Sequence, residues 1–168
     1  MGTTAASKKT MTTSANGLAF IQKWEGFSPK LYDDAAGYCT FGYGHLVAKD
    51  KCDNLQPDQK KPYEGLTEEE AKTKASQLLA SDLVPAEKAV NDHVTVDLTQ
   101  NQFDALVSFA YNVGVGNFKS STLLDKVNAQ EFDKVPGEFK KWVKAGGKRV
   151  QGLVNRRQEE ADLFQKAD

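Results

Sequence analysis

The sequence predicts an α+β fold, and two observations lead to this prediction. Residues 31–47, LYDDAAGYCTFGYGHLV, are dense in aromatic residues and glycines, a composition typical of short strands and tight bends. From Thr67 onward, apolar residues recur at helical spacing through at least four segments. Because the strand-like and helical patterns are segregated along the chain, an α+β fold is favoured over a parallel α/β fold.

The length and composition exclude several classes of protein. The chain has 168 residues and a net charge of −1, with 39% hydrophobic and 27% charged residues. These values fit one soluble domain with a real core, and they exclude a membrane-spanning or wholly disordered protein. The balanced charge argues against a globally basic nucleic-acid binder. Only 2 cysteines are present, which excludes a disulfide-rich mini-protein.

The N-terminal segment differs from the rest of the chain. Residues 1–16 are rich in Thr, Ser and Ala, and we expect a disordered tail or a cloning remnant there, followed by a single domain over 17–168. The segment lacks the apolar stretch of a secretory signal. No run in the chain is apolar for long enough to span a bilayer. We therefore expect synthesis in the cytoplasm without an address signal.

Three elements are expected before the helical part. The apolar spacing of residues 17–25 predicts a short helix, which Gly26 closes. Residues 31–47 predict a small glycine-rich sheet or hairpin. Residues 48–66 are polar and hold two prolines, so they predict a long loop with room for a short return strand.

Local signals mark the later helices. Thr67 and Glu70 form a capping box that starts one helix, and Pro85 either breaks this helix or opens the next. Thr99 and Gln102 form a second capping box, and Gly114 is a suitable stop for the helix that follows. Further helices are expected over 122–129, from Pro136 to Gly146 with Phe139, Trp142 and Val143 inward, and from Val150 to the C-terminus.

Glu25, Asp34 and Thr40 are candidate catalytic residues. Cleavage of a glycosidic bond needs an acid that protonates the leaving oxygen and a group that positions water or attacks the sugar. Glu25 follows Trp24 at the end of an apolar helix, a setting that shelters an acid from solvent. Asp34 lies in a glycine-rich segment that suits an ionised carboxylate, and the Thr40 hydroxyl can bind water. These residue types alone are not specific, because they also suit a helix end and a turn.

The segment from Glu25 to His45 resembles the active-site region of phage-type lysozymes, the endolysins of glycoside hydrolase family 24. The pattern of that family is Glu, eight residues, Asp, five residues, Thr, and Glu25, Asp34 and Thr40 match it. The resemblance extends over about residues 16–166 and is closer to lambdoid, P21-like relatives than to T4-like ones. Further similar segments are FGYGH, QNQFDALVSFAYNVGVGNF, SSTLL, KKWVKAGGK and GLVNRRQEEADLF.

The resemblance implies a lysozyme-like fold, in which a small N-terminal lobe with a short sheet packs against a larger helical lobe. It implies hydrolysis of the β-1,4 bond between N-acetylmuramic acid and N-acetylglucosamine, as in a phage endolysin that lyses its host. Glu25 would be the general acid, and Asp34 and Thr40 would orient water. An inverting or a retaining outcome remains open, because it depends on whether Asp34 orients water or attacks.

The resemblance also implies partners and a site of action. We expect a monomer that binds bacterial peptidoglycan and no nucleic acid, with no cofactor and no metal ion. The enzyme would be made in the host cytoplasm and would act in the periplasm or cell wall after release through a separate pore. The substrate-binding residues implied by position are Leu46, Tyr111, Phe118 and Ser121.

Gly42, Gly44 and His45 are expected to be structural residues near the site. We expect His45 in an ion pair or hydrogen bond behind the site. A metal site is not expected, because His93 is the only other histidine and lies far away in the sequence.

Two further features allow alternatives. We expect Cys39 and Cys52 to be free thiols, as in a protein made in the cytoplasm, and a bridge between them is the alternative. Residues 140–157 contain seven basic residues and no acid, which form either a solvated face or a contact for an anionic wall or outer-membrane lipid. Arg157 falls on the apolar stripe of the last helix and is expected in a partly buried ion pair.

Three alternative functions fit parts of the same sequence. The chain could be the lysozyme domain of a secreted antibacterial toxin, or a lytic transglycosylase, which leaves anhydro ends on its products. A peptidoglycan-binding module without catalysis is the alternative outside the enzymes, and the complete Glu–Asp–Thr pattern argues against it.

Overall fold

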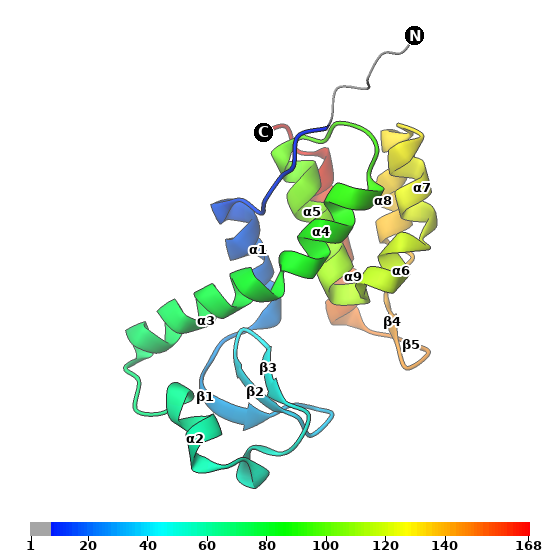
Figure 1. Ribbon diagram of the computed structural model, residues 1–168. Coiled ribbons are helices and arrows are strands. Elements are labelled where there is room, and N and C mark those ends of the chain that lie inside the picture. Colours follow the sequence, from blue (N-terminus) through cyan, green and yellow to red (C-terminus); the bar gives the residue numbers. More distant parts are fainter. Residues whose placement is uncertain (1–7) are drawn as a thin grey trace. The chain divides into compact units, whose positions relative to one another are not determined.

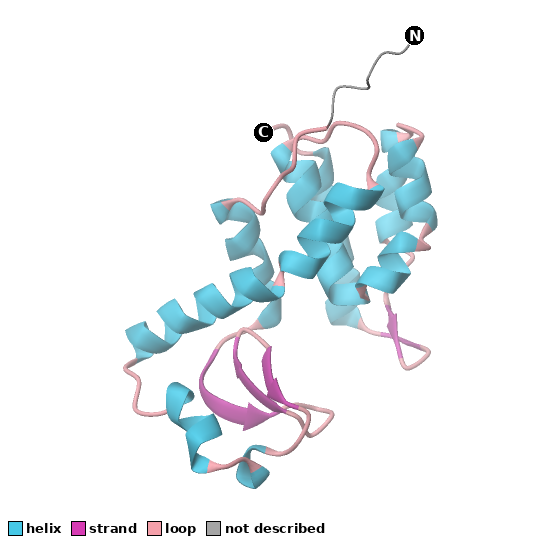
Figure 2. Ribbon diagram, viewed as in Figure 1, coloured by secondary structure: helices cyan, strands magenta, loops and turns pink. Residues whose placement is uncertain are grey.

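The structure is a computed structural model that describes residues 8–168, and the chain forms two compact units. We call residues 19–82 the sheet unit and residues 8–18 together with 83–168 the helical unit (Figure 1). The predicted α+β class is confirmed, with a small three-stranded antiparallel sheet in one unit and predominantly helical structure elsewhere (Figure 2). Within the described part of the chain, no helix has the length and apolar character needed to cross a bilayer.

The sheet unit begins within α1, whose first residues belong to the helical unit. Its three strands are antiparallel in the order β1-β2-β3, so each strand pairs with the next along the chain. Residues 49–66 contain short helical turns, which differs from the expected loop with a return strand. The elements are α1 (Ala15–Glu25), β1 (Ser28–Asp33), β2 (Cys39–Gly42), β3 (His45–Ala48), the 3₁₀ turn η1 (Cys52–Asn54), α2 (Pro57–Lys60), the 3₁₀ turn η2 (Lys61–Tyr63) and α3 (Glu68–Asp82).

The central strand β2 packs closely against α3. Phe41 is fully buried against Ala71 and Ala75. Gly42 has φ +67°, and a Cβ atom there would lie 2.5 Å from the Cβ of Ala75, so this approach requires glycine. Short side chains on both elements thus let the sheet lie directly on the helix.

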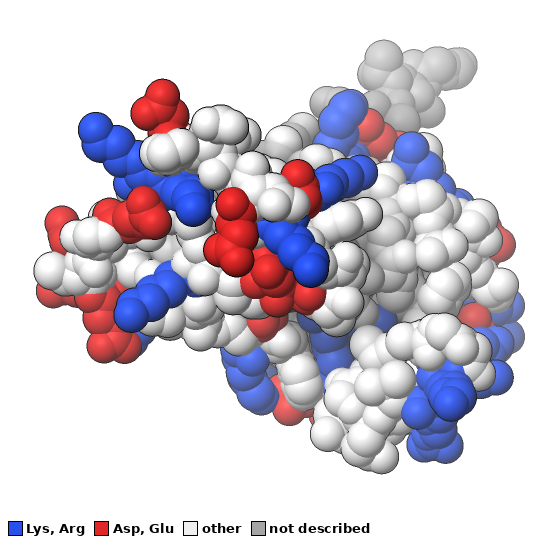
Figure 3. Space-filling model, turned by 90° about the horizontal axis from the view of Figure 1, so that it is seen from below, with Lys and Arg blue, Asp and Glu red and all other residues white. Residues whose placement is uncertain are grey.

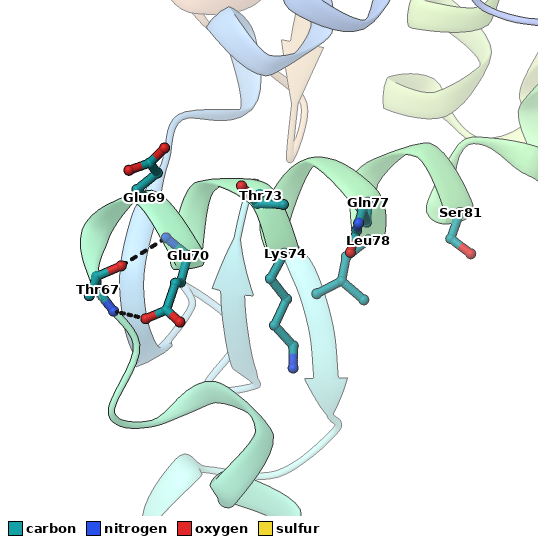
Figure 4. A pocket seen from close by; sticks show the side chains of 8 residues that line it. All are labelled: Thr67, Glu69, Glu70, Thr73, Lys74, Gln77, Leu78 and Ser81. Atoms are coloured by element: carbon teal, nitrogen blue, oxygen red, sulfur yellow. Dashed lines mark hydrogen bonds between the residues drawn. The ribbon is translucent and has the colours of Figure 1, made fainter.

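The capping box predicted for α3 is confirmed. The Thr67 N–H donates to Glu70 Oε1 at 2.8 Å, and the Glu70 N–H donates to Thr67 Oγ1 at 3.1 Å (Figure 4). Two backbone donors at the start of the helix are therefore satisfied by side chains.

The helical unit is arranged around α5, in which all residues from Phe103 to Ala110 are buried. Phe109 lies at the centre of this core, with its ring centroid 5.4 Å from that of Phe139 and 6.4 Å from that of Phe118. The elements are α4 (Val84–His93), α5 (Gln100–Val113), α6 (Val115–Lys119), α7 (Thr122–Asn128), the 3₁₀ turn η3 (Phe132–Lys134), α8 (Val135–Phe139), β4 (Lys144–Ala145), β5 (Lys148–Arg149) and α9 (Gln151–Gln165).

The local signals for α4 and α5 are also confirmed. Pro85 opens α4 in its first turn. Thr99 caps α5, with Gln102 completing the box, and Gly114 ends this helix with φ +100°.

The helix expected from Pro136 to Gly146 is wrong in its second half. The helix α8 ends at Phe139, and residues 144–149 form the β4–β5 hairpin. Gly146 and Gly147 have φ of +58° and +80°, so the glycine pair forms the turn of a hairpin and is not a helix stop.

The expected tail over 1–16 does not hold for residues 8–14, and residues 1–7 lie outside the described part. The Met11 N–H donates to Asn91 Oδ1 at 3.0 Å, and the Thr13 N–H donates to Glu87 Oε2 at 2.8 Å. This segment therefore lies along α4, and α1 begins directly after it.

A buried ion pair confirms the expectation for Arg157. Arg157 and Glu160 are both fully buried, and Nε lies 2.6 Å from Oε1. Ser108 donates its hydroxyl to Glu160 at 2.5 Å, and Arg156 approaches the same carboxylate at 3.3 Å. Burial lowers the pKa of the Arg157 guanidinium, while the Glu160 charge opposes this shift.

Candidate active site

Glu25 is the last residue of α1 and lies against the turn between β2 and β3. A Cβ atom placed on Gly44 would be 3.3 Å from Glu25 Oε1, and Gly44 has φ +77°. A larger residue at this position would crowd the carboxylate and strain the turn. Gly44 thus lies next to the carboxylate of the predicted general acid.

Asp34 directly follows β1 and is held by the β1–β2 turn. Its Oδ1 atom accepts hydrogen bonds from the backbone N–H groups of Ala36 and Tyr38, both at 2.9 Å. Its own N–H donates to the Tyr38 carbonyl at 2.9 Å. The other carboxylate oxygen, Oδ2, accepts no hydrogen bond from the described residues. One oxygen therefore fixes the orientation of the carboxylate, and the other remains available to a ligand or water.

Thr40 lies in the middle of the central strand, where it pairs with Tyr32 on β1 and Leu46 on β3. It is almost fully buried, and its hydroxyl donates to the Tyr38 carbonyl at 2.9 Å. Asp34 and Thr40 are therefore both hydrogen-bonded to the backbone of Tyr38. Because the Thr40 hydroxyl donates its proton there, its oxygen lone pairs are available to accept a hydrogen bond.

His45 is paired, as the sequence predicts. Its Nδ1 atom lies 2.8 Å from Asp82 Oδ2, and both side chains are half-buried. This contact joins the start of β3 to the end of α3. Among residues 8–168, no group of three or more His, Cys, Asp or Glu side chains is arranged to hold a metal ion.

The expectation of two free thiols is wrong, because Cys39 and Cys52 form a disulfide with their Cα atoms 4.7 Å apart. The bridge joins the residue before Thr40 to the η1 turn. Asp33, the last residue of β1, accepts a hydrogen bond from the Cys52 N–H at 2.8 Å. Asp33 also lies opposite Cys39 in the strand register, so it supports the bridge from the neighbouring strand.

The four predicted substrate-binding residues lie in different settings. Leu46 is 42% exposed on the strand next to Thr40, and Tyr111 is half-buried in α5. Phe118 is fully buried, and Ser121 is almost fully buried as the N-cap of α7. Phe118 thus packs in the core of the helical unit and Ser121 caps a helix, whereas Leu46 and Tyr111 are accessible in part.

Each unit also has a hollow on its own surface. A hollow of about 620 Å³ runs along α3 in the sheet unit, and none of the predicted catalytic residues line it (Figure 4). A second hollow, of about 340 Å³, lies on the helical unit, and two of its lining residues directly follow Tyr111 in the chain. It is lined by Asn112, Val113, Asn117, Trp142, Lys144, Ala145, Leu153 and Arg157.

The basic stretch 140–157 is only partly a surface. Arg156 and Arg157 are buried, and Lys141 is paired with Glu138 at 2.8 Å. Basic side chains also gather on part of the surface seen from below (Figure 3). Four exposed basic residues of this stretch form no ion pair with the described residues: Lys140, Lys144, Lys148 and Arg149, of which the last three belong to the β4–β5 hairpin.

Comparisons with known proteins agree with the resemblance seen in the sequence. The family model described as phage lysozyme matches residues 22–160. The endolysin of Bacillus phage B103 is 44% identical over 156 residues, covering 92% of this chain and 54% of the relative. The endolysin of Acyrthosiphon pisum secondary endosymbiont phage 1 is 37% identical over 161 residues, covering 94% of this chain and 100% of the relative.

Solved structures are similar over almost the whole chain. The P22 lysozyme structure has a TM-score of 0.77 and 34% identity, covering 93% of this chain and 99% of that one. The muramidase domain of SpmX from Asticaccaulis excentricus has a TM-score of 0.74 and 31% identity, covering 95% and 99%. In contrast, the chain spans about half the length of the Bacillus phage endolysins that it matches.

Proposed function

The chain belongs to the phage lysozyme family, and from this premise we propose that it is an endolysin that hydrolyses peptidoglycan. The bond cleaved is the β-1,4 linkage between N-acetylmuramic acid and N-acetylglucosamine. One observation carries the proposal. Two members of the Glu25, Asp34 and Thr40 pattern are hydrogen-bonded to the backbone of the same residue, since Asp34 accepts from the Tyr38 N–H and Thr40 donates to the Tyr38 carbonyl. A shared anchor of this kind suits two groups that must hold one water molecule.

In the proposed reaction, Glu25 protonates the leaving glycosidic oxygen. Asp34 Oδ2 and Thr40 Oγ1 both act as acceptors, and a water molecule has two protons with which to bind them. Its oxygen then attacks the anomeric carbon with a lone pair, while the Asp34 carboxylate accepts the proton that the water releases and the bond to the leaving oxygen breaks. Hydrolysis in a single displacement inverts the anomeric configuration, whereas attack by Asp34 itself would retain it. Product anomers observed directly by NMR distinguish the two.

Substitution of the general acid tests the proposal. Glu25→Gln keeps the size of the side chain but removes the proton donor, and we expect at least about 10²-fold slower release of muropeptides from purified sacculi. Glu69→Gln, an exposed change on α3, is the matched control and should retain wild-type activity. Unchanged activity of Glu25→Gln would refute the assignment.

The chemistry of the products separates the alternatives. Mass spectrometry should find reducing muropeptide ends, with a water molecule added at each cleaved bond. Anhydro ends would instead identify a lytic transglycosylase. Binding to sacculi without release of any fragment would identify a non-catalytic binding module.

We further propose that Leu46 and Tyr111 contact the glycan. Apolar and aromatic surfaces pack on sugar rings, and both side chains are accessible in part. Asn112 and Asn117, which line the hollow near Tyr111 in the chain, can read N-acetyl groups with their amides. Tyr111→Ala should raise KM more than it lowers kcat, and Phe132→Ala is a control that removes a ring elsewhere in the helical unit.

The β4–β5 hairpin is the proposed contact for an anionic wall component. Lys144, Lys148 and Arg149 are exposed, and the hairpin contains no acidic residue to neutralise them. Replacing all three by Ser should weaken binding to sacculi and reduce its salt dependence. The control variant replaces Lys119 and Lys166 by Ser and should bind as the wild type does.

The proposed sites of synthesis and action follow the endolysin assignment. The monomeric enzyme is made in the host cytoplasm and reaches the wall through a separate pore. Sedimentation of the purified protein tests the monomer. Lysis of cells only after their membrane is permeabilised tests the route.

A further inference from the structure

One tyrosine lies beside the proposed site and has no part in the reaction described above. Tyr32 is on β1, directly opposite Thr40, and two residues before Asp34. Residues paired across antiparallel strands share a face of the sheet, and so do residues two apart along a strand. The register therefore places Tyr32 on the face that carries Thr40, and the bond from the Asp34 N–H to the Tyr38 carbonyl continues the pairing of the two chain segments up to Asp34.

The Tyr32 side chain is accessible and its hydroxyl is not committed elsewhere. It is a large aromatic side chain, and 37% of it is exposed. Its hydroxyl makes no hydrogen bond to the described residues. Asp34 Oδ2, the oxygen that lacks a backbone donor, is likewise without a partner in the described part of the chain.

The electrostatic surroundings of Tyr32 agree with this placement. Burial raises the pKa of the Tyr32 hydroxyl, and the negative charges of Asp34 and Glu25 raise it further. Because the hydroxyl remains protonated through neutral pH, it can act as a hydrogen-bond donor at this site.

We propose that Tyr32 is a positioning residue whose hydroxyl donates a hydrogen bond to Asp34 Oδ2 when the glycan is bound. The inference rests on the proposed function. Hydrogen bonds in unliganded active sites are often long and tighten only in the substrate complex. Asp34 is then held at both oxygens, by the turn at Oδ1 and by Tyr32 at Oδ2. Each carboxylate oxygen has two acceptor sites, so Oδ2 still binds the hydrolytic water.

This arrangement has a consequence for the pH profile. A hydrogen bond donated to a carboxylate favours its ionised form. Without the Tyr32 hydroxyl, the ionised carboxylate loses one hydrogen-bond donor, so we expect the acid limb of kcat/KM to move to higher pH. A residue that only supports the fold would lower the amount of active enzyme without moving this limb.

Tyr32→Phe tests the proposal because it removes only the hydroxyl. We expect kcat to fall about tenfold, as for loss of a hydrogen bond to a charged group, with KM changed less than about twofold. The acid limb should move upward by about half a pH unit. Tyr63→Phe is the matched control, because Tyr63 packs against Phe41 in the core of the sheet unit, and it should leave both quantities unchanged.

Two further measurements make the test decisive. In an Asp34→Asn background, Tyr32→Phe should have little additional effect, because the two residues act as one unit. Wild-type kcat with an unmoved acid limb would overturn the proposal, and so would a change confined to KM, which would make Tyr32 a glycan contact. Failure of the proposed function is recognised separately, by the absence of reducing muropeptide ends from the wild-type protein.

Discussion

The two units of the molecule hold their polar groups in opposite ways. In the sheet unit, Asp34, Thr40 and Cys52 are fixed by a turn, by backbone hydrogen bonds and by a disulfide. In the helical unit, Arg157 and Glu160 are paired inside the core. The smaller unit has few fully buried apolar residues around Phe41. We therefore expect its disulfide and its hydrogen-bonded turns to contribute a larger share of its stability than such features do in the helical unit.

The largest effect on stability is expected from the helical unit. Glu160→Ala removes the buried carboxylate that pairs with the fully buried Arg157, and we expect the free energy of unfolding to fall by about 3–5 kcal/mol. Denaturant titration measures this change. The control is Asp162→Ala, which removes an exposed carboxylate from the same helix and should cost less than about 0.5 kcal/mol. Equal costs for the two variants would contradict a buried network.

The next effect concerns the disulfide of the sheet unit. Reduction, or a double Cys39→Ala and Cys52→Ala change, removes a short covalent loop and should cost about 3 kcal/mol in the chain-entropy model. Amide exchange should increase in β2 and η1 while α5 remains protected, because local opening energies differ between regions. A reducing agent should have no effect on the double variant. If amide protection is lost equally in both units, the disulfide does not stabilise the sheet unit selectively.

A smaller effect is expected from Gly42→Ala, which tests the close contact of β2 with α3. The added methyl group would overlap Ala75, and the positive φ disfavours any residue but glycine, for a cost of about 1–3 kcal/mol. Gly137→Ala is the control, since a Cβ there meets nothing within 4 Å. If Ala75→Gly restores stability to Gly42→Ala, the overlap is the cause. If it restores none, strain in the backbone accounts for the loss.

The smallest effect on stability is expected from the loss of one helix N-cap in each unit. Thr67→Ala and Thr99→Ala each remove the cap of a long helix, one in each unit, and each should cost about 1 kcal/mol. Thr73→Ala, an exposed change within α3, should have almost no effect. Thermal unfolding midpoints suffice for the comparison. Unequal losses at the two caps would show that the units differ in local cooperativity.

Features set by neighbouring residues could be predicted from the sequence. The capping boxes at Thr67 and Thr99 and the stop at Gly114 depend on side chains within four residues of one another, so their signals are complete in the chain itself. The pairing of Arg157 was also predictable, because a charge on an apolar stripe needs a partner. The spacing of Glu25, Asp34 and Thr40 became informative only through resemblance to a family.

Features set by tertiary packing could not be predicted in this way. The Cys39–Cys52 bridge depends on the path of residues 43–51, and composition does not determine that path. Gly146 and Gly147 suit a helix stop as well as a hairpin turn, and the strand pairing on either side decides between them. Phe118 was expected at a substrate because of its position in the family pattern, but burial beside Phe109 places it in the core.

The disulfide between Cys39 and Cys52 also affects how a proteolytic cut in the chain can be detected. The residues between them include Thr40 and the entire β2–β3 turn. A protease that cuts once within this interval severs the backbone, but both fragments remain linked through sulfur. On a non-reducing gel the nicked enzyme would migrate as one full-length band, so intactness in a lysate rich in host proteases has to be judged after reduction.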